Sequence, residues 1–93
     1  MAKCVPHPVD VELGRRLEAA RVRSGLTLRA LAPAAGVTWQ QLRKYELAAD
    51  RVTVSRLWAI ARALDKSMTS FVRGLDAIQE ARRAPRRGPT GKK

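Results

Sequence analysis

Five side chains near the middle of the chain have the chemistry to recognise the edges of nucleic-acid bases. They are Trp39, Gln40, Gln41, Arg43 and Lys44. A glutamine amide can bond bidentately to adenine, a lysine donates to the acceptors of guanine, and a large apolar ring can touch a thymine methyl. Because Thr38 is a favourable N-cap, we expect these side chains to project from the front of a short helix that can enter a DNA groove.

The hydrophobic pattern predicts a scaffold of helices that would hold this segment. Apolar residues recur at helical spacing in five segments, over residues 10–24, 28–35, 39–47, 54–64 and 68–78. Residues favoured as N-caps stand directly before the last four segments: Thr27, Thr38, Thr53 and Ser67. Gly25 and Gly36 are expected to end the first two helices. No segment alternates apolar and polar residues as a strand would, so the prediction is an all-α domain of five short helices over residues 10–80.

The charge balance favours a polyanionic partner. Nineteen Lys and Arg against eight Asp and Glu give a net charge of +11, and a field of that size attracts nucleic acid or anionic membrane. We expect residues 1–9 to be a flexible arm and residues 81–93 to be a disordered basic tail. The tail is interpreted as a phosphate anchor, with a solubilising extension or a cloning remnant as alternatives.

Several classes of protein do not fit this composition. One cysteine, Cys4, and one histidine, His7, are too few for a closed zinc site or a Cys/His nucleophile system, so we expect neither a metal nor a cofactor. The first ten residues lack the apolar stretch of a secretion signal, and no apolar run has the length of a membrane span. The prediction is a cytoplasmic, nucleoid-associated protein that is not an enzyme and has no membrane partner.

A longer series of residues extends the pattern over well over half of the chain. It consists of Leu13-Gly14-Arg15-Arg16-Leu17, Gly25-Leu26-Thr27, Leu31-Ala32, Gly36-Val37-Thr38, Leu42, Tyr45-Glu46, Thr53, Leu57 and Ile60-Ala61-Arg62-Ala63-Leu64. In this register the sequence resembles the Cro and phage-repressor type helix-turn-helix family, also called the xenobiotic-response-element (XRE) family. The resemblance implies a five-helix, lambda-repressor-like DNA-binding domain.

The resemblance also implies roles for particular residues. The third helix would lie in the major groove, with Trp39, Gln40 and Lys44 at base-facing positions and Gln41 and Arg43 beside them. Phosphate contacts would come from residues near helix starts and in the loop after the third helix: Thr27, Arg29, Thr38, Arg51, Thr53 and Arg56. Arg21 and Glu46 match a pair that ties the first helix to the end of the third, which is a structural role.

Three positions depart from the family pattern. Leu28 replaces a polar residue, often Gln, that commonly bonds to phosphate and to the recognition helix. Pro33 falls inside the second helix, where we expect a kink or an early end because proline lacks a backbone N–H. Ala48 replaces the glycine that normally closes the third helix, so the following loop is expected to take another path.

The apolar residues of the last two helices allow two interpretations. Phe71, Val72, Leu75 and Ile78 either cover the domain's own core or form half of a dimer seam, and Trp58 is favoured as core over interface.

The predicted function is a sequence-specific transcriptional regulator, a repressor in its simplest form. It would bind double-stranded DNA as a homodimer and use no small-molecule effector. The alternatives are an antitoxin that also regulates its own promoter, and a nucleoid-type or RNA-binding protein that relies on charge alone.

Overall fold

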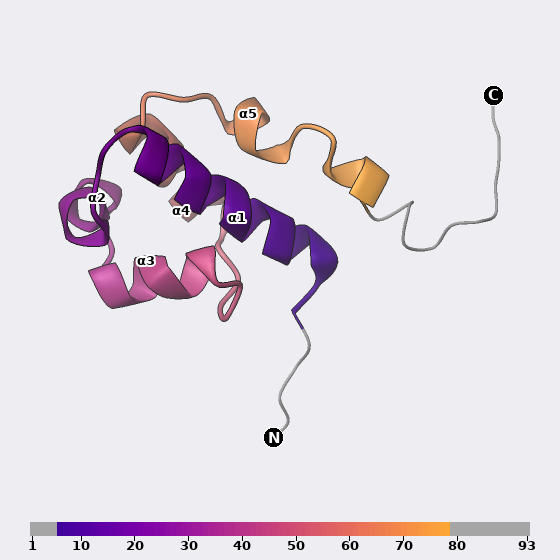
Figure 1. Cartoon of the computed structure of the whole chain (residues 1–93), viewed down its shortest axis with the longest axis horizontal. Coiled ribbons are helices and arrows are strands. Elements are labelled where there is room, and N and C mark those ends of the chain that lie inside the picture. Colours follow the sequence, from indigo (N-terminus) through magenta and orange to yellow (C-terminus); the bar gives the residue numbers. More distant parts are fainter. Residues whose placement is uncertain (1–5, 79–93) are drawn as a thin grey trace, which may run out of the picture.

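Five α-helices, followed by a helical turn over residues 75–78, make up most of the described part of the chain (Figure 1). The computed structural model describes residues 6–78, and no strand occurs among them. The helices are α1 (Pro8–Arg23), α2 (Leu28–Ala35), α3 (Trp39–Glu46), α4 (Val54–Ala63) and α5 (Met68–Val72). The predicted all-α fold is therefore confirmed. Within residues 6–78 no helix is long and apolar enough to cross a membrane.

The long helix α1 lies between α3 and α5. It contacts α3 on one side and α5 on the other, while α2 packs on both α3 and α4; Figure 1 shows α3 below α1 and α5 above it. The largest fully buried side chains come from all five helices and are Leu17, Leu31, Leu42, Ile60 and Phe71. Burial of such side chains removes apolar surface from water, which is the main force that holds the helices in this arrangement.

Side-chain caps begin four of the helices at the expected residues. The Oγ1 atoms of Thr27, Thr38 and Thr53 each accept a hydrogen bond at 3.1 Å from the backbone N–H three residues later. Ser67 does the same for α5 at 3.3 Å. Each such cap stabilises its helix by about 1 kcal/mol. Helix starts were predictable here because the signal lies within four residues of sequence.

The start of α1 differs from the expectation. The helix begins at Pro8, two residues before Asp10, so Pro8 and Val9 do not belong to an arm. His7 caps it by accepting the N–H of Val9 on Nδ1 at 3.1 Å. Proline suits the first helical position because its missing N–H would have no partner there. Cys4, the rest of the expected arm before residue 6 and the expected basic tail lie outside the described residues.

The fifth helix is shorter than predicted. It ends at Val72 instead of continuing to Ile78, because Arg73 is extended and Gly74 takes a φ of +78°. Glycine adopts this left-handed conformation without a side-chain clash, so the chain turns there before the helical turn of residues 75–78. The prediction of one helix over residues 68–78 was wrong.

Pro33 does not end α2 early. The helix continues to Ala35, where Gly36 closes it with a φ of +77°, as the sequence predicted. Pro33 is exposed and stands in the second half of the helix. Its missing N–H therefore deprives only the carbonyl of Arg29, near the helix start, of an intrahelical bond.

Ala48 takes the conformation that a glycine would take at this place. Its φ is +60°, and the next residue, Ala49, donates its N–H to the carbonyl of Lys44 at 2.8 Å. This bond closes α3 in the manner of helices that end in a left-handed residue. At Ala48 itself the chain therefore keeps the left-handed turn of a glycine, and the path of the loop onward to Thr53 stays a prediction.

Ala48→Gly is expected to stabilise the domain. A left-handed alanine costs about 1–2 kcal/mol, and glycine removes that cost against a smaller loss of chain entropy, so a gain of about 0.5–1 kcal/mol follows. Ala34→Gly, at an exposed position inside α2, is the matched control and should cost about 1 kcal/mol. Urea unfolding measures both; equal destabilisation by the two changes would contradict the argument.

Candidate nucleic-acid interface

The turn between α2 and α3 is held from behind by α4. Arg56, near the start of α4, donates from Nη1 to the carbonyl of Ala35 at 3.1 Å and to that of Gly36 at 3.4 Å. These carbonyls end α2 and have no helical donor of their own. Arg56 was expected to contact phosphate, but its guanidinium is half-buried and engaged in the turn. The structure therefore makes it a positioning residue for the helix-turn-helix.

A buried ion pair fixes the far end of α3. The guanidinium of Arg21 donates from Nε to Oε2 of Glu46 at 2.7 Å and from Nη2 to Oε1 at 3.2 Å. A third bond, from Nη1 to the carbonyl of Leu26 at 2.9 Å, ties the same group to the start of the motif. The side chain of Glu46 is fully buried, and its hydrogen bond raises the pKa of Arg21 above the usual range. The pair joins α1 to α3, the structural role that the resemblance implied.

Close backbone contact brings α1 onto the same end of α3. Gly14 is buried inside α1, and a Cβ atom at this position would lie 2.7 Å from the carbonyl oxygen of Tyr45. Only glycine allows this approach. Sequence reasoning did not single out Gly14 for this role, although a glycine inside a helix costs about 1 kcal/mol and is a signal of close packing.

The five predicted base-contacting residues divide into two groups. Gln40, Arg43 and Lys44 are exposed, and Gln40 and Lys44, four residues apart, lie on one face of α3. Trp39 and Gln41 are only partly exposed. The Nε2 of Gln41 donates to Asp50 in the following loop at 3.1 Å, and Trp39 packs against the core. Of the side chains that we expected to project from the front of this helix, Gln40 and Lys44 therefore share one exposed face, and the indole of Trp39 is partly covered.

Comparison with known proteins agrees with this geometry. A family model described as helix-turn-helix matches residues 17–71. The chain belongs to the XRE-type helix-turn-helix family. A likeness of this breadth covers all of α2, α3 and α4, which are the elements that present and hold the exposed face of α3.

Named relatives and solved structures share the same domain. An uncharacterized HTH-type transcriptional regulator of Rickettsia conorii is 41% identical over 68 residues, which are 73% of this chain and 54% of that protein. An uncharacterized transcriptional regulator in the ATPase CF(0) region of Rhodospirillum rubrum is 37% identical over 70 residues, 75% of this chain and 65% of that protein. The chain thus spans about half the length of the Rickettsia protein. A crystal structure of the clp gene regulator ClgR from Corynebacterium glutamicum superposes with a TM-score of 0.72 at 27% identity, over 84% of this chain and 86% of that one.

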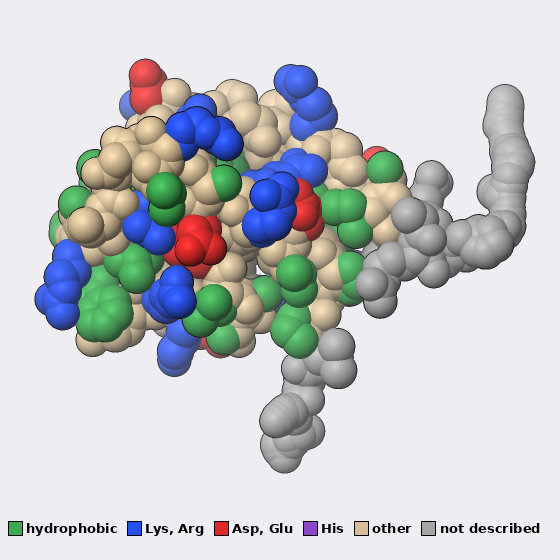
Figure 2. All heavy atoms as spheres, in the orientation of Figure 1, with side chains coloured by type: hydrophobic (Ala, Val, Ile, Leu, Met, Phe, Trp, Pro, Cys, Tyr) green, Lys and Arg blue, Asp and Glu red, His purple; other side chains and the backbone are tan. Residues whose placement is uncertain are grey.

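Two exposed cations of this XRE-type domain, one on α3 and one in the loop after it, pair with carboxylates of α1. Arg43 lies 3.9 Å from Glu18, and Arg51 lies 3.2 Å from Asp10 with 80% of its own side chain exposed. Exposed ion pairs of this kind contribute little free energy, so either guanidinium can exchange its carboxylate for a phosphate. Figure 2, which looks onto α1, shows Lys and Arg side chains spread over that side of the molecule with acidic ones between them. On that side the positive charge is therefore not gathered in a single patch.

The remaining predicted phosphate contacts stand at helix starts. Thr27, Thr38 and Thr53 are exposed N-caps of α2, α3 and α4. Each hydroxyl accepts one backbone N–H, which leaves other free N–H groups of the first turn directed outward. Arg29 is exposed in the first turn of α2, and its guanidinium carbon lies 4.7 Å from the centroid of the Trp39 ring.

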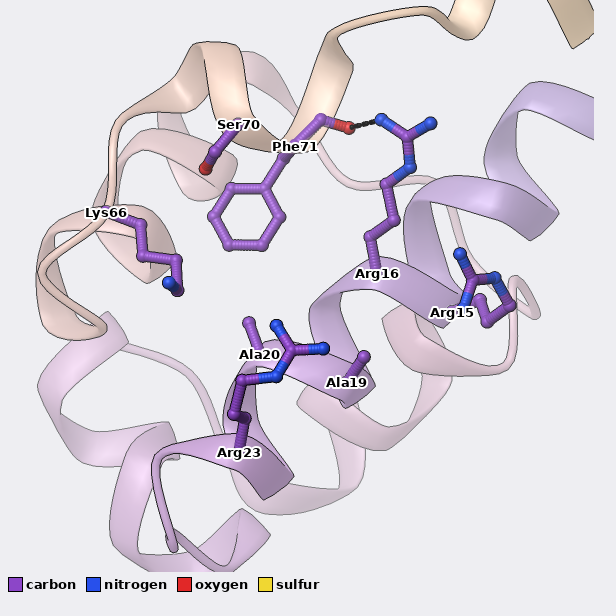
Figure 3. Close-up of a pocket in the computed structure, with 8 residues that line it drawn as sticks. All are labelled: Arg15, Arg16, Ala19, Ala20, Arg23, Lys66, Ser70 and Phe71. Carbon is purple, nitrogen blue, oxygen red and sulfur yellow. Dashed lines mark hydrogen bonds between the residues drawn. The ribbon is translucent and has the colours of Figure 1, made fainter.

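A hollow on the other side of α1 is lined by four cations, Arg15, Arg16, Arg23 and Lys66, of which Arg15 and Arg16 bond to other groups of the domain. Figure 3 shows Arg16 directed from α1 to the carbonyl of Phe71, to which Nη1 donates at 3.1 Å; a second bond reaches the carbonyl of Arg73 at 2.7 Å. The carboxylate of Glu12 accepts hydrogen bonds from Arg15 and from Arg16. These bonds, of which that from Arg15 has the larger effect, lower the pKa of Glu12 to about 2. This cluster links α1 to the segment after α5.

Glu12→Gln is expected to lower the stability of the domain at pH 7 but not at pH 2. The folded carboxyl has a pKa of about 2, below its ordinary value of 4.5, so the stabilisation is present above pH 4.5 and is lost as the pH falls toward 2. At pH 7 the variant should be less stable by about 0.5 kcal/mol, since solvent screens a partly exposed pair. Thermal unfolding of both proteins at pH 7 and pH 2 measures the difference, which should vanish at pH 2; a constant difference would contradict the assignment.

Two of the four residues that the sequence left open between core and dimer seam are buried. Phe71 and Leu75 are 2% and 9% exposed, and Figure 3 shows the Phe71 ring directed toward α1; Ile78 is half-buried. Of the seam residues, Val72 is exposed. Trp58, which the sequence favoured as core, is 52% exposed on α4, with the guanidinium carbon of Arg62 5.1 Å from its ring centroid. Of the two interpretations, the core one is therefore confirmed for Phe71 and Leu75, which fill the domain's own interior.

Proposed function

We propose that this chain is a sequence-specific DNA-binding transcriptional regulator that inserts α3 into the major groove. The observation that carries the proposal is the exposure of Gln40 and Lys44 on one face of a helix that is fixed at both ends. The cap at Thr38 and the clamp from Arg56 hold its start, and the pair of Arg21 with Glu46 holds its end. A rigid helix keeps these side chains in register with base edges, which selective recognition requires.

Gln40 and Lys44 are the proposed base contacts, with Trp39, Gln41 and Arg43 at their border. Phosphates are contacted by Arg51, by Arg29 and by the helix starts at Thr27, Thr38 and Thr53, where free N–H groups and the positive end of the helix dipole attract anions. The names of the relatives as HTH-type transcriptional regulators support a role in transcription. The protein would act in the cytoplasm, on the nucleoid.

The proposed form is a homodimer that represses by occupying a two-fold operator. Reading helices of such dimers lie about 34 Å apart, one turn of the duplex. Trp58 and Val72 are exposed apolar side chains outside the α2–α3 motif, and a second copy is the partner proposed for them. Selection of duplexes from a random library tests the proposal directly. The expected result is two related half-sites with centres about 10 base pairs apart; bound sequences without any preference would overturn it.

Two substitutions should separate base contacts from phosphate contacts. Lys44→Ala is expected to relax the preference at one base position by about 1–3 kcal/mol, because the lysine donates to a base acceptor. Arg51→Ala should weaken binding to every sequence alike. It should also reduce the slope of log affinity against log salt concentration by about one, the amount expected for one lost phosphate contact. Titrations with the selected duplex and with scrambled DNA at several salt concentrations measure both effects. If both variants lose affinity uniformly, the division of roles fails.

A further inference from the structure

We infer that Arg29 and Trp39 act together as one reader of a thymine next to a guanine. The inference rests on the proposed function and changes one of its assignments, because Arg29 becomes a base contact. The two side chains come from different helices: Arg29 stands in the first turn of α2 and Trp39 is the first residue of α3. The guanidinium carbon lies over the indole ring, 4.7 Å from its centroid, so the two groups form one cation–π pair where α3 begins.

Stacking on the ring limits the orientations of the guanidinium. A planar guanidinium that rests on an aromatic face keeps its edge N–H groups free, and that fork matches two acceptors placed side by side. In the major groove, N7 and O6 of guanine are such a pair. Arg29 is exposed, while the indole beneath it is half-buried and packs against the core. The indole is thus a rigid support and the arginine is the group that meets the base.

A hollow of about 320 Å³ opens beside this stack, between α2 and the start of α3. Four of its lining residues are apolar, Ala32, Pro33, Val37 and Trp39, and the lining is completed by Arg29, Thr38 and Gln40. The 5-methyl group of thymine is the apolar group that base edges present in the major groove. Because Gln40, one of the exposed residues of α3, also lines the hollow, a thymine methyl is the occupant that we assign to it. Pro33 then has a role in this wall that offsets the helix bond it removes.

Base analogues test the inference on the unaltered protein. In a duplex selected from a random library, each thymine is replaced in turn by uracil, which lacks the methyl group, and each guanine by 7-deazaguanine, which lacks N7. The expected result is one thymine and one adjacent guanine whose replacement each weakens binding about tenfold. Arg29→Ala, which removes every donor of this side chain, should abolish the effect of 7-deazaguanine at that position while effects elsewhere persist. Arg62→Ala is the matched control, since the guanidinium carbon of Arg62 lies 5.1 Å from the ring centroid of Trp58 on α4, and it should leave every analogue effect unchanged.

The outcomes separate this inference from the function on which it rests. If the protein selects a sequence but no adjacent thymine and guanine are sensitive, the paired reader is refuted and the regulator remains. The same holds if Arg29→Ala weakens all duplexes equally, which would return Arg29 to a phosphate contact. A protein that selects no sequence at all overturns the proposed function and the inference together.

Discussion

Glu46→Ala is expected to lower the free energy of unfolding by about 3–5 kcal/mol, because it leaves the guanidinium of Arg21 buried without its counter-charge. The Glu46 side chain is fully buried and that of Arg21 is 10% exposed, so water cannot replace the lost partner. Small domains have total stabilities of about 5–15 kcal/mol, so this single change would remove a large part. Urea unfolding followed by circular dichroism measures the loss.

A double replacement is the control for that experiment. In Arg21→Met with Glu46→Leu both charges are gone, and apolar pairs of similar volume often restore stability. The double variant should therefore be more stable than Glu46→Ala alone. It should nevertheless bind DNA less selectively, since the bidentate pair and the bond to Leu26 set the position of α3. A Glu46→Ala protein that loses less than about 1 kcal/mol, the net contribution of a typical hydrogen bond, would show that the pair is not buried as described.

Gly14→Ala is expected to destabilise the domain by about 2 kcal/mol, although alanine is the better helix former by about 1 kcal/mol. The added Cβ would collide with the backbone carbonyls of Tyr45 and Glu46. Backbone at the end of α3 cannot move aside as a flexible side chain could, so α1 and α3 must separate. Thermal unfolding measures the sign of the change in stability. Helix propensity alone predicts that alanine stabilises the domain, whereas the collision with the backbone predicts that it destabilises it.

Gly25→Ala isolates the other cost of replacing a glycine. Gly25 has a φ of +75° and nothing within 4 Å of an added Cβ, so the change introduces backbone strain of about 1–2 kcal/mol without a collision. Gly14→Ala should in addition weaken DNA binding, since it displaces the end of the reading helix, whereas Gly25→Ala should leave the affinity of the folded protein unchanged. Stabilisation of the domain by Gly14→Ala would disprove the close contact.

Features set by a few neighbouring residues could be predicted from the sequence. The threonine caps at 27, 38 and 53 and the left-handed glycine at 36 act within one helical turn, so the bounds of α2 matched and those of α3 and α4 matched to within one residue. The family was also evident, because its residues recur in fixed register over Leu13 to Phe71. The end of α5 was harder to predict. Gly74 was expected within the helix, but the chain leaves helical geometry at Arg73.

Only the tertiary structure decided how polar side chains are used. Arg56, which we expected to contact phosphate, donates a hydrogen bond to the carbonyl of Ala35 in the turn of the helix-turn-helix. Gln41 donates to Asp50, and the guanidinium of Arg29 lies over the ring of Trp39. Phe71 likewise faces the interior instead of a partner. Each of these contacts joins residues of different elements, which the hydrophobic periodicity of a single helix does not relate. The partner of a long side chain depends on which groups the packed helices bring within a few ångströms of it. Local sequence therefore determined which residues form helices, while packing determined which of their charges are available to DNA.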